Sequence, residues 1–306
     1  MDPYEEVPLS EYPNLRDEYE EFVAKWAEYG IDVKEVMKAS LLVGAATEEN
    51  LPWYSAHIES AFPWREWNRR WTTEEKSHGE IMARAIEARG VVDMSKEWLP
   101  IREQNMVAGI HLAVVSIADS LAYVSTQELL TQIAHFHSAR VMDESGAKNL
   151  RAIGGDEGRH YRFYISILRE LTSIDPDIAL AGMRRQHEGD SFAMPGQKGI
   201  TGYNNFARTI ALSGIFDALT VLEAQRQTII DAGLLDSEPV SDQGKKDQEW
   251  AVGIVSKNDP IWLSKAHLLE LIRDRAHRQK STNGLSQFIL GRTVRIVGSK
   301  YVPISS

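Results

Sequence analysis

Two Glu-x-x-His strings, Glu75 to His78 and Glu157 to His160, each lie in a run of residues with helical periodicity. Positions i and i+3 share one face of an α-helix, so the two side chains of each string can reach the same ion. A carboxylate oxygen and an imidazole nitrogen are both common metal ligands. With nine histidines in the chain, roughly one such string is expected by chance, so a single copy would equally suit a solvated helix face.

The two strings belong to a repeated unit. Glu48 precedes Glu75 by 27 residues, and Glu128 precedes Glu157 by 29. In each unit, a helix with a glutamate is followed by a turn and by a helix with the Glu-x-x-His string. Ferritin-like di-iron carboxylate bundles take a glutamate from each of two helices and Glu-x-x-His from each of the other two. The sequence therefore predicts a two-metal site with the ligands Glu48, Glu75, His78, Glu128, Glu157 and His160.

The chemistry of this ligand set explains its residue types. Four carboxylates offset much of the charge of two divalent ions, and one imidazole for each ion leaves positions open for dioxygen as co-substrate. Two iron ions fit these ligands, and manganese or a mixed pair fits the same ligand types. Glu128 has no lysine or arginine within one helical turn, so a metal explains this carboxylate better than a buried ion pair. Glu48 has a stronger alternative, an ordinary helix end beside Glu49.

Helical periodicity dominates the rest of the chain and predicts an all-α fold, a ferritin-like four-helix-bundle core extended by additional helices. Asp32 and Glu35 predict a capping box at one helix start, and Gly90 predicts a helix end. One predicted helix of about 35 residues would be on the order of 50 Å long. The predicted helical runs cover about 17–49 with a break at 30–32, then 65–89, 104–143, 146–173, 203–233 and 259–278.

The domain organisation is predicted to be simple. Residues 1–278 would form a single ferritin-like di-iron helical domain, and residues 279–306 a C-terminal tail that packs on the bundle or on a partner chain. Two stretches rich in glycine, proline or polar residues, 188–202 and 234–248, are predicted to be loops too short to require a domain boundary. Strand-like alternation is almost absent before 292–302.

The composition argues against several classes of protein. There are 34 basic and 44 acidic side chains, and the formal net charge of −10 makes nucleic acid a poor partner. Cysteine is absent, which excludes disulfides, thiolate zinc sites, cysteine nucleophiles and an intrinsic iron–sulfur cluster. Any electrons would therefore come from another protein or a soluble carrier. The acidic first thirty residues do not resemble a secretory signal, and no stretch approaches the roughly 18 apolar residues of a membrane span, so we expect a cytoplasmic protein.

Four strings centred on the ligands resemble those of the soluble acyl-acyl carrier protein desaturases of plants and actinobacteria. These strings are Val43–Tyr54, Trp71–Gly79, Ser125–Thr131 and Asp156–His160, within a similarity that covers about 15–260. The resemblance implies an oxidoreductase of fatty acid biosynthesis, in which a reduced di-iron pair activates dioxygen and a cis double bond is formed in a fatty acyl chain on acyl carrier protein. It also implies a homodimer and a ferredoxin-type electron donor.

The resemblance chooses between neighbouring residues. It implies Glu48 rather than Glu49 as the first ligand, because the ligand directly follows a threonine in the family's string. It implies Glu75 rather than Glu74, since only Glu75 lies three residues before His78.

Three further residues receive roles from the resemblance. Asp156 would hydrogen-bond a ligating histidine, Trp71 would join the same network and the electron route, and Thr131 would face the dioxygen pocket. Simple core packing is an equal alternative for Trp71. His135 is a further match to the family.

Departures from the family leave the substrate open. His57 and Phe62 follow the first ligand, where the plant enzymes have apolar or small residues. The stretch 118–121, which precedes Glu128, reads Ala-Asp-Ser-Leu and is more polar than a plain alkyl tunnel. These differences allow another acyl length, another carrier or another oxidation.

Acyl carrier protein is acidic, so a docking patch should be basic. Candidate clusters are Arg65, Arg69 and Arg70, or Arg184 and Arg185. A solvated helix face explains either cluster at least as well.

Two other functions remain open from the sequence. A related di-iron oxygenase, a hydroxylase or N-oxygenase of specialised metabolism, would use the same ligands, and an added oxygen atom in the product would identify it. A non-catalytic ferritin-like metal-binding protein would oxidise iron without an acyl substrate, but storage bundles are shorter than this chain of 306 residues.

Overall fold

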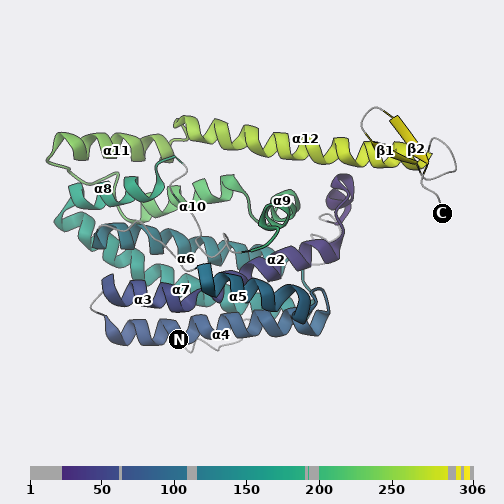
Figure 1. The fold of residues 1–306 in the computed structure, drawn as a ribbon. Coiled ribbons are helices and arrows are strands. Elements are labelled where there is room, and N and C mark those ends of the chain that lie inside the picture. Colours follow the sequence, from purple (N-terminus) through teal and green to yellow (C-terminus); the bar gives the residue numbers. More distant parts are fainter. Residues whose placement is uncertain are drawn as a thin grey trace.

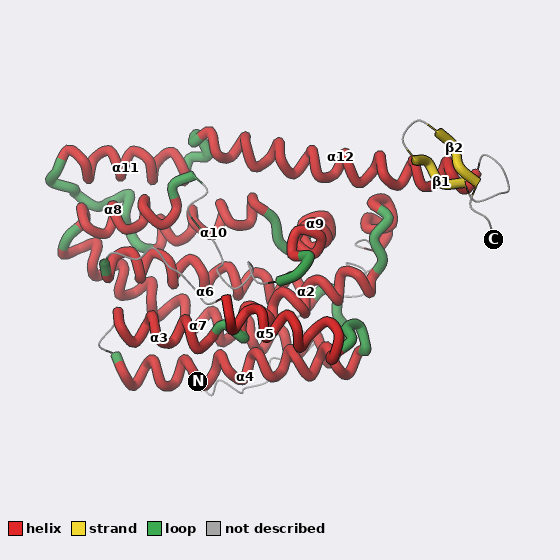
Figure 2. The backbone as a smooth tube through the Cα atoms, viewed as in Figure 1, coloured by secondary structure: helices red, strands yellow, loops and turns green. Residues whose placement is uncertain are grey.

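The computed structural model describes residues 23–61, 64–108, 116–189, 192, 200–288, 294–297 and 300–303. These residues form helices and one short β-hairpin (Figure 1, Figure 2), and residues 23–29 are also helical. The elements are α2 (Val33–Glu48), α3 (Leu51–Ala61), α4 (Arg65–Arg89), a π-helical turn (Met94–Trp98), α5 (Leu99–Ala108), α6 (Ile117–Ala139), α7 (Glu144–Ile174), α8 (Pro176–His187), α9 (Tyr203–Ser213), α10 (Ala218–Asp231), α11 (Asp242–Val255), α12 (Pro260–Phe288), β1 (Val294–Val297) and β2 (Lys300–Pro303).

The core consists of two helix pairs, α2 with α4 and α6 with α7. Figure 1 shows α6 and α7 in the middle of the molecule, with α3, α4 and α5 on one side and α8 and α10 on the other. The outer layer is formed by α11 and α12, and α12 continues past the bundle to the antiparallel hairpin of β1 and β2. The expected all-α fold with a four-helix core is confirmed.

Helix α6 is buried along almost its whole length, from Ala118 to Thr131 and again at His135. Its only carboxylates are Asp119 and Glu128, and a buried carboxylate needs a partner. The Asp119 carboxylate accepts a hydrogen bond from Arg185 Nε at 2.8 Å. The polar stretch 118–121, which suggested an unusually polar tunnel, therefore contains an ion pair with α8. Glu128 has a different set of neighbours, described below.

Two predicted helix boundaries are confirmed by their capping geometry. The Asp32 side chain accepts from Glu35 N at 2.9 Å and the Glu35 carboxylate accepts from Asp32 N at 3.2 Å, which is the capping box at the start of α2. Helix α4 ends at Gly90, whose φ of 58° lies in the left-handed region that glycine adopts without strain.

The single predicted helix over 104–143 is wrong. Helix α5 ends at Ala108, and α6 begins only after Ser116, while residues 109–115 lie outside the described residues. Ser116 has an extended backbone, and its hydroxyl accepts from Asp119 N at 3.2 Å, so it is an N-cap. Hydrophobic periodicity does not register such a start, although a serine three residues before an acidic residue is a recognised capping signal.

The predicted helix over 203–233 is also divided. Gly214 ends α9 with φ 77°, and Asp217 starts α10 with a capping box to Thr220. The predicted loop 234–248 is shorter, because α11 begins at Asp242.

Near the C-terminus, α12 continues ten residues beyond the predicted end at 278, and the hairpin agrees with the alternation seen at 292–302. The predicted boundary between domain and tail thus falls inside a helix. Most of the predicted loop 188–202 lies outside the described residues.

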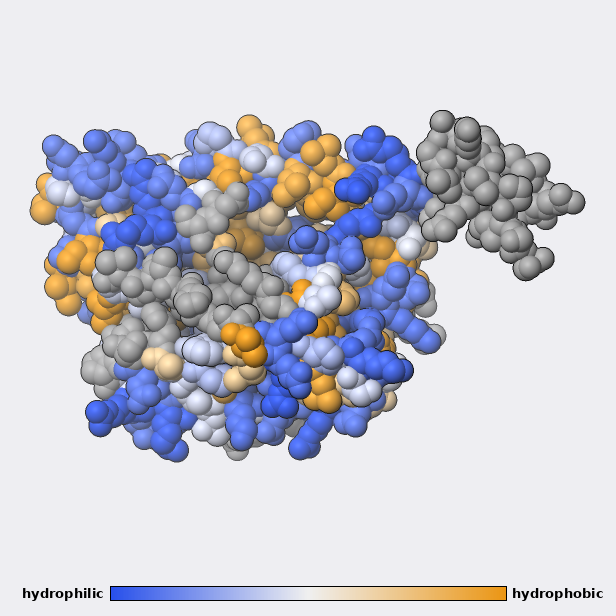
Figure 3. All heavy atoms as spheres, viewed as in Figure 1, coloured by the Kyte–Doolittle hydropathy of each residue, from blue (hydrophilic) through white to orange (hydrophobic). Residues whose placement is uncertain are grey.

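Within the described residues, none of the helices combines the length and the apolar composition needed to cross a membrane. The surface in Figure 3 is largely hydrophilic, with apolar atoms gathered along α12 and near the junction of α7 and α8. The exposed apolar side chains there include Leu263, Leu271 and Ile174.

Close packing of α8 on α6 gives a stability prediction. A Cβ added at Gly182 would lie 2.8 Å from the backbone carbonyl carbon of Ala118, whereas a Cβ at Gly155, in the middle of α7, would meet nothing within 4 Å. Gly182→Ala should lower the free energy of unfolding by about 1–3 kcal/mol. Gly155→Ala should raise it by up to about 1 kcal/mol, since alanine favours a helix more than glycine. Urea denaturation measures both, and an unchanged midpoint for Gly182→Ala would contradict the close approach.

Candidate metal centre

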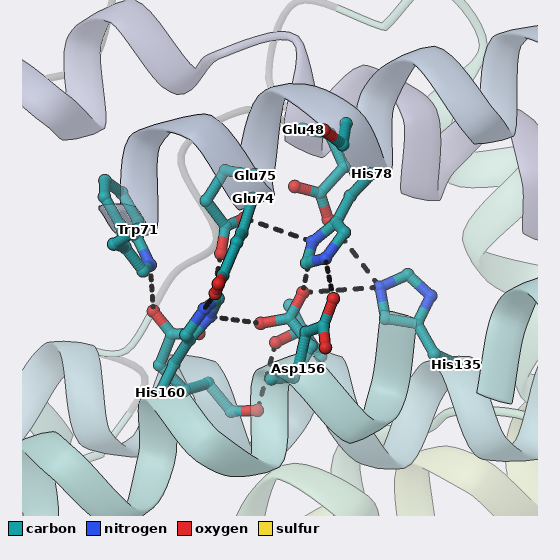
Figure 4. Close-up of polar contacts among 12 residues, drawn as sticks. Glu48, Trp71, Glu74, Glu75, His78, His135, Asp156 and His160 are labelled. Carbon is teal, nitrogen blue, oxygen red and sulfur yellow. Dashed lines mark hydrogen bonds and ion pairs between the residues drawn. The ribbon is translucent and has the colours of Figure 1, made fainter. Parts of the chain in front are cut away.

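All six predicted ligands meet in the middle of the four-helix core. Figure 4 labels four of them, Glu48, Glu75, His78 and His160. Each of the six residues exposes 7% or less of its surface. The four core helices share the contribution: Glu48 comes from α2, Glu75 and His78 from α4, Glu128 from α6, and Glu157 and His160 from α7.

The ligands form two overlapping groups. Glu48, Glu75, His78 and Glu157 make one group, and Glu75, Glu128, Glu157 and His160 make the other. Within each group the ligand atoms lie within 4.8 Å of one another. Glu75 and Glu157 belong to both groups, so their two oxygens can serve two ions at once. The arrangement suits a pair of ions with two shared carboxylates, one further carboxylate each and one imidazole each.

Several atoms that face this centre lack hydrogen-bond partners. Glu75 Oε1, His78 Nδ1 and Glu157 Oε1 are buried, and although nitrogen and oxygen atoms of the cluster come as close as 2.9 Å, none of these three makes a well-oriented hydrogen bond to a described residue. Buried polar atoms without partners are rare in native proteins and cost free energy. Divalent cations would supply the missing partners, so the residues present fit the metal pair that their types predict.

The two imidazoles are oriented in the same way. Each directs Nδ1 to the centre: His78 Nδ1 lies 3.3 Å from Glu157 Oε1, and His160 Nδ1 lies 2.9 Å from Glu75 Oε1. The outward nitrogens meet carboxylates of the opposite helix, with His78 Nε2 3.1 Å from Asp156 Oδ2 and His160 Nε2 2.9 Å from Glu74 Oε2. Such outer carboxylates fix the ring and its tautomer.

Glu74 is a site residue that sequence reasoning missed, whereas Asp156, which makes the matching contact to His78, was among the predicted residues. The signal was present, because an acidic residue directly precedes the glutamate of each Glu-x-x-His string. Arg159 forms ion pairs with both outer carboxylates, so the two halves of the site are linked on this side as well.

Trp71 and Thr131 both lie against the cluster. Trp71 is buried, and its Nε1 donates to Glu128 Oε1 at 3.2 Å, so the indole is bonded to a predicted ligand rather than to Asp156. The Thr131 hydroxyl donates to the backbone oxygens of Gln127 and Glu128 at 3.1 and 3.0 Å. Thr131 also lines the cavity described below.

His135 is a second residue without a role in the sequence analysis that lies at the site. Its Nε2 is 3.6 Å from Glu48 Oε1 and 3.8 Å from Glu157 Oε1, with no hydrogen-bond partner among the described residues. Burial lowers the pKa of His135 to about 4, so the ring is neutral at pH 7. The signal was its spacing, since residues 128, 131 and 135 lie on one face of α6.

The protonation of the cluster follows from burial and crowding. Burial, together with the charge of Glu75, holds the pKa of Glu48 well above its usual range, and burial with the charge of Glu157 does the same for Glu128. Burial disfavours the charged imidazoles, but the hydrogen bonds that their N–H groups donate to carboxylates, Asp156 for His78 and Glu128 for His160, raise the pKa of both rings. Without cations the cluster thus holds protons that ions would displace, so metal uptake should release protons.

A cavity of about 590 Å³ lies beside the cluster, between α2, α6, α9 and α10. Glu48, Thr131 and His135 form part of its wall at the metal end. The apolar lining includes Val43, Met82, Leu130, Ile210, Val221 and Ile272. The His57 side chain and Phe62, which the sequence analysis singled out for the substrate, lie outside the described residues.

The family model described as fatty acid desaturase matches residues 2–282. The chain belongs to this family. Stearoyl-[acyl-carrier-protein] 9-desaturase 1 of Arabidopsis thaliana is 24% identical over 326 aligned residues, which cover 96% of this desaturase-family chain and 76% of the relative. Palmitoyl-[acyl-carrier-protein] 4-desaturase of Coriandrum sativum is 25% identical over 261 residues, which cover 79% of this chain and 68% of the relative.

The DesA2 X-ray structure from Mycobacterium tuberculosis H37Rv is 18% identical in sequence, with a TM-score of 0.48 over 68% of this chain and 76% of that one. The two plant relatives named above act at different positions, 9 and 4, so membership of the family does not define the position of oxidation.

The carboxylate behind His160 gives a prediction for metal binding. Glu74→Leu should weaken binding of the second of two ferrous or manganous ions by about 10–100-fold, because the His160 ring loses the partner that orients it. Glu80→Leu, at an exposed position of the same helix, is the matched control and should leave both affinities unchanged. Anaerobic calorimetric titration measures them, and equal affinities in wild type and Glu74→Leu would contradict this role.

Proposed function

We propose that the chain is a di-iron, dioxygen-dependent desaturase that forms a cis double bond in a fatty acyl chain carried on acyl carrier protein. The observation that carries this proposal is the position of the cluster at the wall of a largely apolar cavity of about 590 Å³. A cavity of this size and lining suits a long apolar chain. Membership of the desaturase family supports the same activity, and both relatives named above are acyl-[acyl-carrier-protein] desaturases.

When bound, a reduced iron pair would activate dioxygen, the oxidant needed to remove hydrogens from unactivated methylene groups. The chain's own residues do the rest. Glu48 and Thr131 form the boundary between the cluster and the cavity, and His135 adds a neutral imidazole beside them. The apolar lining keeps the bound chain extended next to the cluster and excludes water, so that oxidation is directed to the bound chain.

Electrons reach the proposed site from outside, since the chain contains no cysteine and hence no iron–sulfur cluster. A surface depression of about 340 Å³ is lined by Trp67, Arg70, Trp71, Glu74, Arg159 and Arg162. Trp71 spans from this depression to Glu128, a proposed ligand. Three arginines suit an acidic donor, so a ferredoxin-type protein that docks here is the electron source we propose.

The docking surface for acyl carrier protein is less distinct. Arg69 pairs with Glu66 at 2.9 Å, and Arg184 pairs with Asp247 at 2.9 Å, so these guanidinium groups have partners within the chain. Arg185 pairs with the buried Asp119. The first cluster has three arginines to the one acidic partner, Glu66, and so keeps a positive charge that can attract an acidic carrier. The second cluster is matched by acidic partners, which favours a structural role for it. Exposed leucines on α12 are compatible with the proposed homodimer.

The alternative activities have less support. A hydroxylase or N-oxygenase would use the same cluster, but no described feature of the cavity favours it over desaturation. A storage protein has no use for an apolar cavity of this volume beside its metal site. The mass of the product separates these activities, because desaturation removes two hydrogens and hydroxylation adds one oxygen.

The proposal predicts the phenotype of Glu128→Ala. The variant should bind less iron and form no double bond, while its metal-free form should melt at no lower temperature than wild type, since a buried carboxylate with a raised pKa is removed. The assay is mass spectrometry of acyl-carrier-protein thioesters after incubation with ferrous protein, an electron donor and dioxygen.

Glu170→Ala, an exposed position on α7, is the control and should retain iron and activity. Full iron content and turnover in Glu128→Ala would refute the assigned cluster. A product of the wild type that contains a new oxygen atom and no double bond would refute the proposed reaction.

A further inference from the structure

The polar groups that line the cavity are almost all paired within the chain. Ser40 Oγ donates to Ser138 Oγ at 2.6 Å, and Thr47 donates to the Val43 carbonyl at 2.9 Å. Among the described lining residues, two buried side-chain nitrogens have no hydrogen-bond partner: His135 Nε2, at the metal end, and Arg208 Nε. The second has no relation to the metal ligands and calls for an acceptor that a ligand would bring.

Arg208 lies on α9, which Figure 1 shows almost along its axis, so that α9 runs across the direction of the long core helices. Its side chain is half-buried, and its Nη2 donates to Gln279 Oε1 of α12 at 2.7 Å. No described carboxylate lies within ion-pair distance of the guanidinium. The side chain is thus held in place at one end, while its Nε–H remains available.

Arg208 also lines a second depression, of about 480 Å³, on the other side of α9. We call it the polar groove, and its lining includes Tyr29, Glu35, Gln279 and Lys280. Lys280 Nζ donates to the Ala27 carbonyl at 2.6 Å, and Glu35 is occupied in the capping box of α2. Arg208 therefore stands where an apolar cavity and a polar groove meet.

The cluster and the polar groove lie toward opposite ends of α2. Glu48 is in the cluster and Glu35 lines the groove, and their separation of thirteen positions corresponds to roughly 20 Å of helix. A ligand that occupied both spaces would place an apolar chain toward the metals, one polar group beside Arg208 and a polar arm in the groove.

A fatty acyl thioester has this sequence of groups, an alkyl chain, a carbonyl and then an amide-containing pantetheine arm. Resting on the proposed function, we propose that Arg208 Nε donates a hydrogen bond to the thioester carbonyl of the substrate and that the polar groove takes the pantetheine arm. Arg208 then determines the direction in which the chain enters. Because the carbonyl is held at one end of the cavity, Arg208 also determines which carbons lie beside the cluster.

The test is a comparison of two ligands that differ in one oxygen atom. S-acyl pantetheine and the S-alkyl thioether of equal chain length are titrated against the full chain without dioxygen, so that no turnover occurs. Wild type should bind the thioester at least about tenfold more tightly, the ratio expected for a hydrogen bond from a charged donor. Arg208→Met should reduce this ratio to near one, whereas Lys245→Met, at an exposed position on α11, should preserve it.

A wild type that binds the two ligands equally would overturn the proposal without any variant, as would a preserved ratio in Arg208→Met. Should Arg208→Met not fold, a second comparison in wild type remains, with an acyl N-acetylcysteamine thioester that lacks most of the arm. Weaker binding of this truncated ligand supports the polar groove as the site of the arm, and equal binding overturns it. If the thioester preference depends on Arg208 but no double bond forms, the carbonyl site stands and the proposed activity fails.

Discussion

The structure is organised around the cost of burying four carboxylates in one place. Glu48, Glu75, Glu128 and Glu157 are each almost completely enclosed by the four core helices. Charges of one sign at such short separations oppose folding unless cations or protons neutralise them. In the metal-free chain, protons on the cluster meet part of this demand, as the raised pKa values of Glu48, Glu128 and the two imidazoles indicate. A pair of divalent cations would neutralise the four carboxylates more completely. The same site would then contribute both to the stability of the fold and to its chemistry.

The rest of the core is built to hold this cluster rigidly. Helix α6 is enclosed on nearly all sides, and Gly182 of α8 approaches the α6 backbone at Ala118 so closely that no side chain fits between them. The second carboxylate of α6, Asp119, is neutralised by Arg185 instead of by a cation. One helix thus carries two buried acids that are neutralised in different ways. Asp119 is paired with an arginine, and only Glu128 is placed where it could bind a metal ion.

Much of this could be predicted from the sequence, because the decisive signals are local. The i, i+3 spacing within each Glu-x-x-His string places both side chains on one face, and a repeated unit brings two such faces together. Residues whose role depends on a partner far away in the sequence were harder to find. Glu74 was rejected as a ligand, and its contact with His160 depends on how α4 meets α7. The breaks at Ser116 and Gly214 were not predicted, because apolar periodicity continues across both positions. Capping determines them instead: Ser116 caps the start of α6, and Gly214 caps the end of α9.

The two halves of the cluster have the same ligands but unlike surroundings. The half at His160 has Trp71 and Glu74 as neighbours, and both residues line a depression on the protein surface. The half at His78 has Glu48 and His135 as neighbours, and both of these line the apolar cavity. A repeated sequence unit has therefore produced a polarised centre, with one side toward the surface depression and the other toward the cavity. Two ions placed there would have like ligands but different surroundings, so they would differ chemically. A duplicated motif would in this way give two metal positions with different properties.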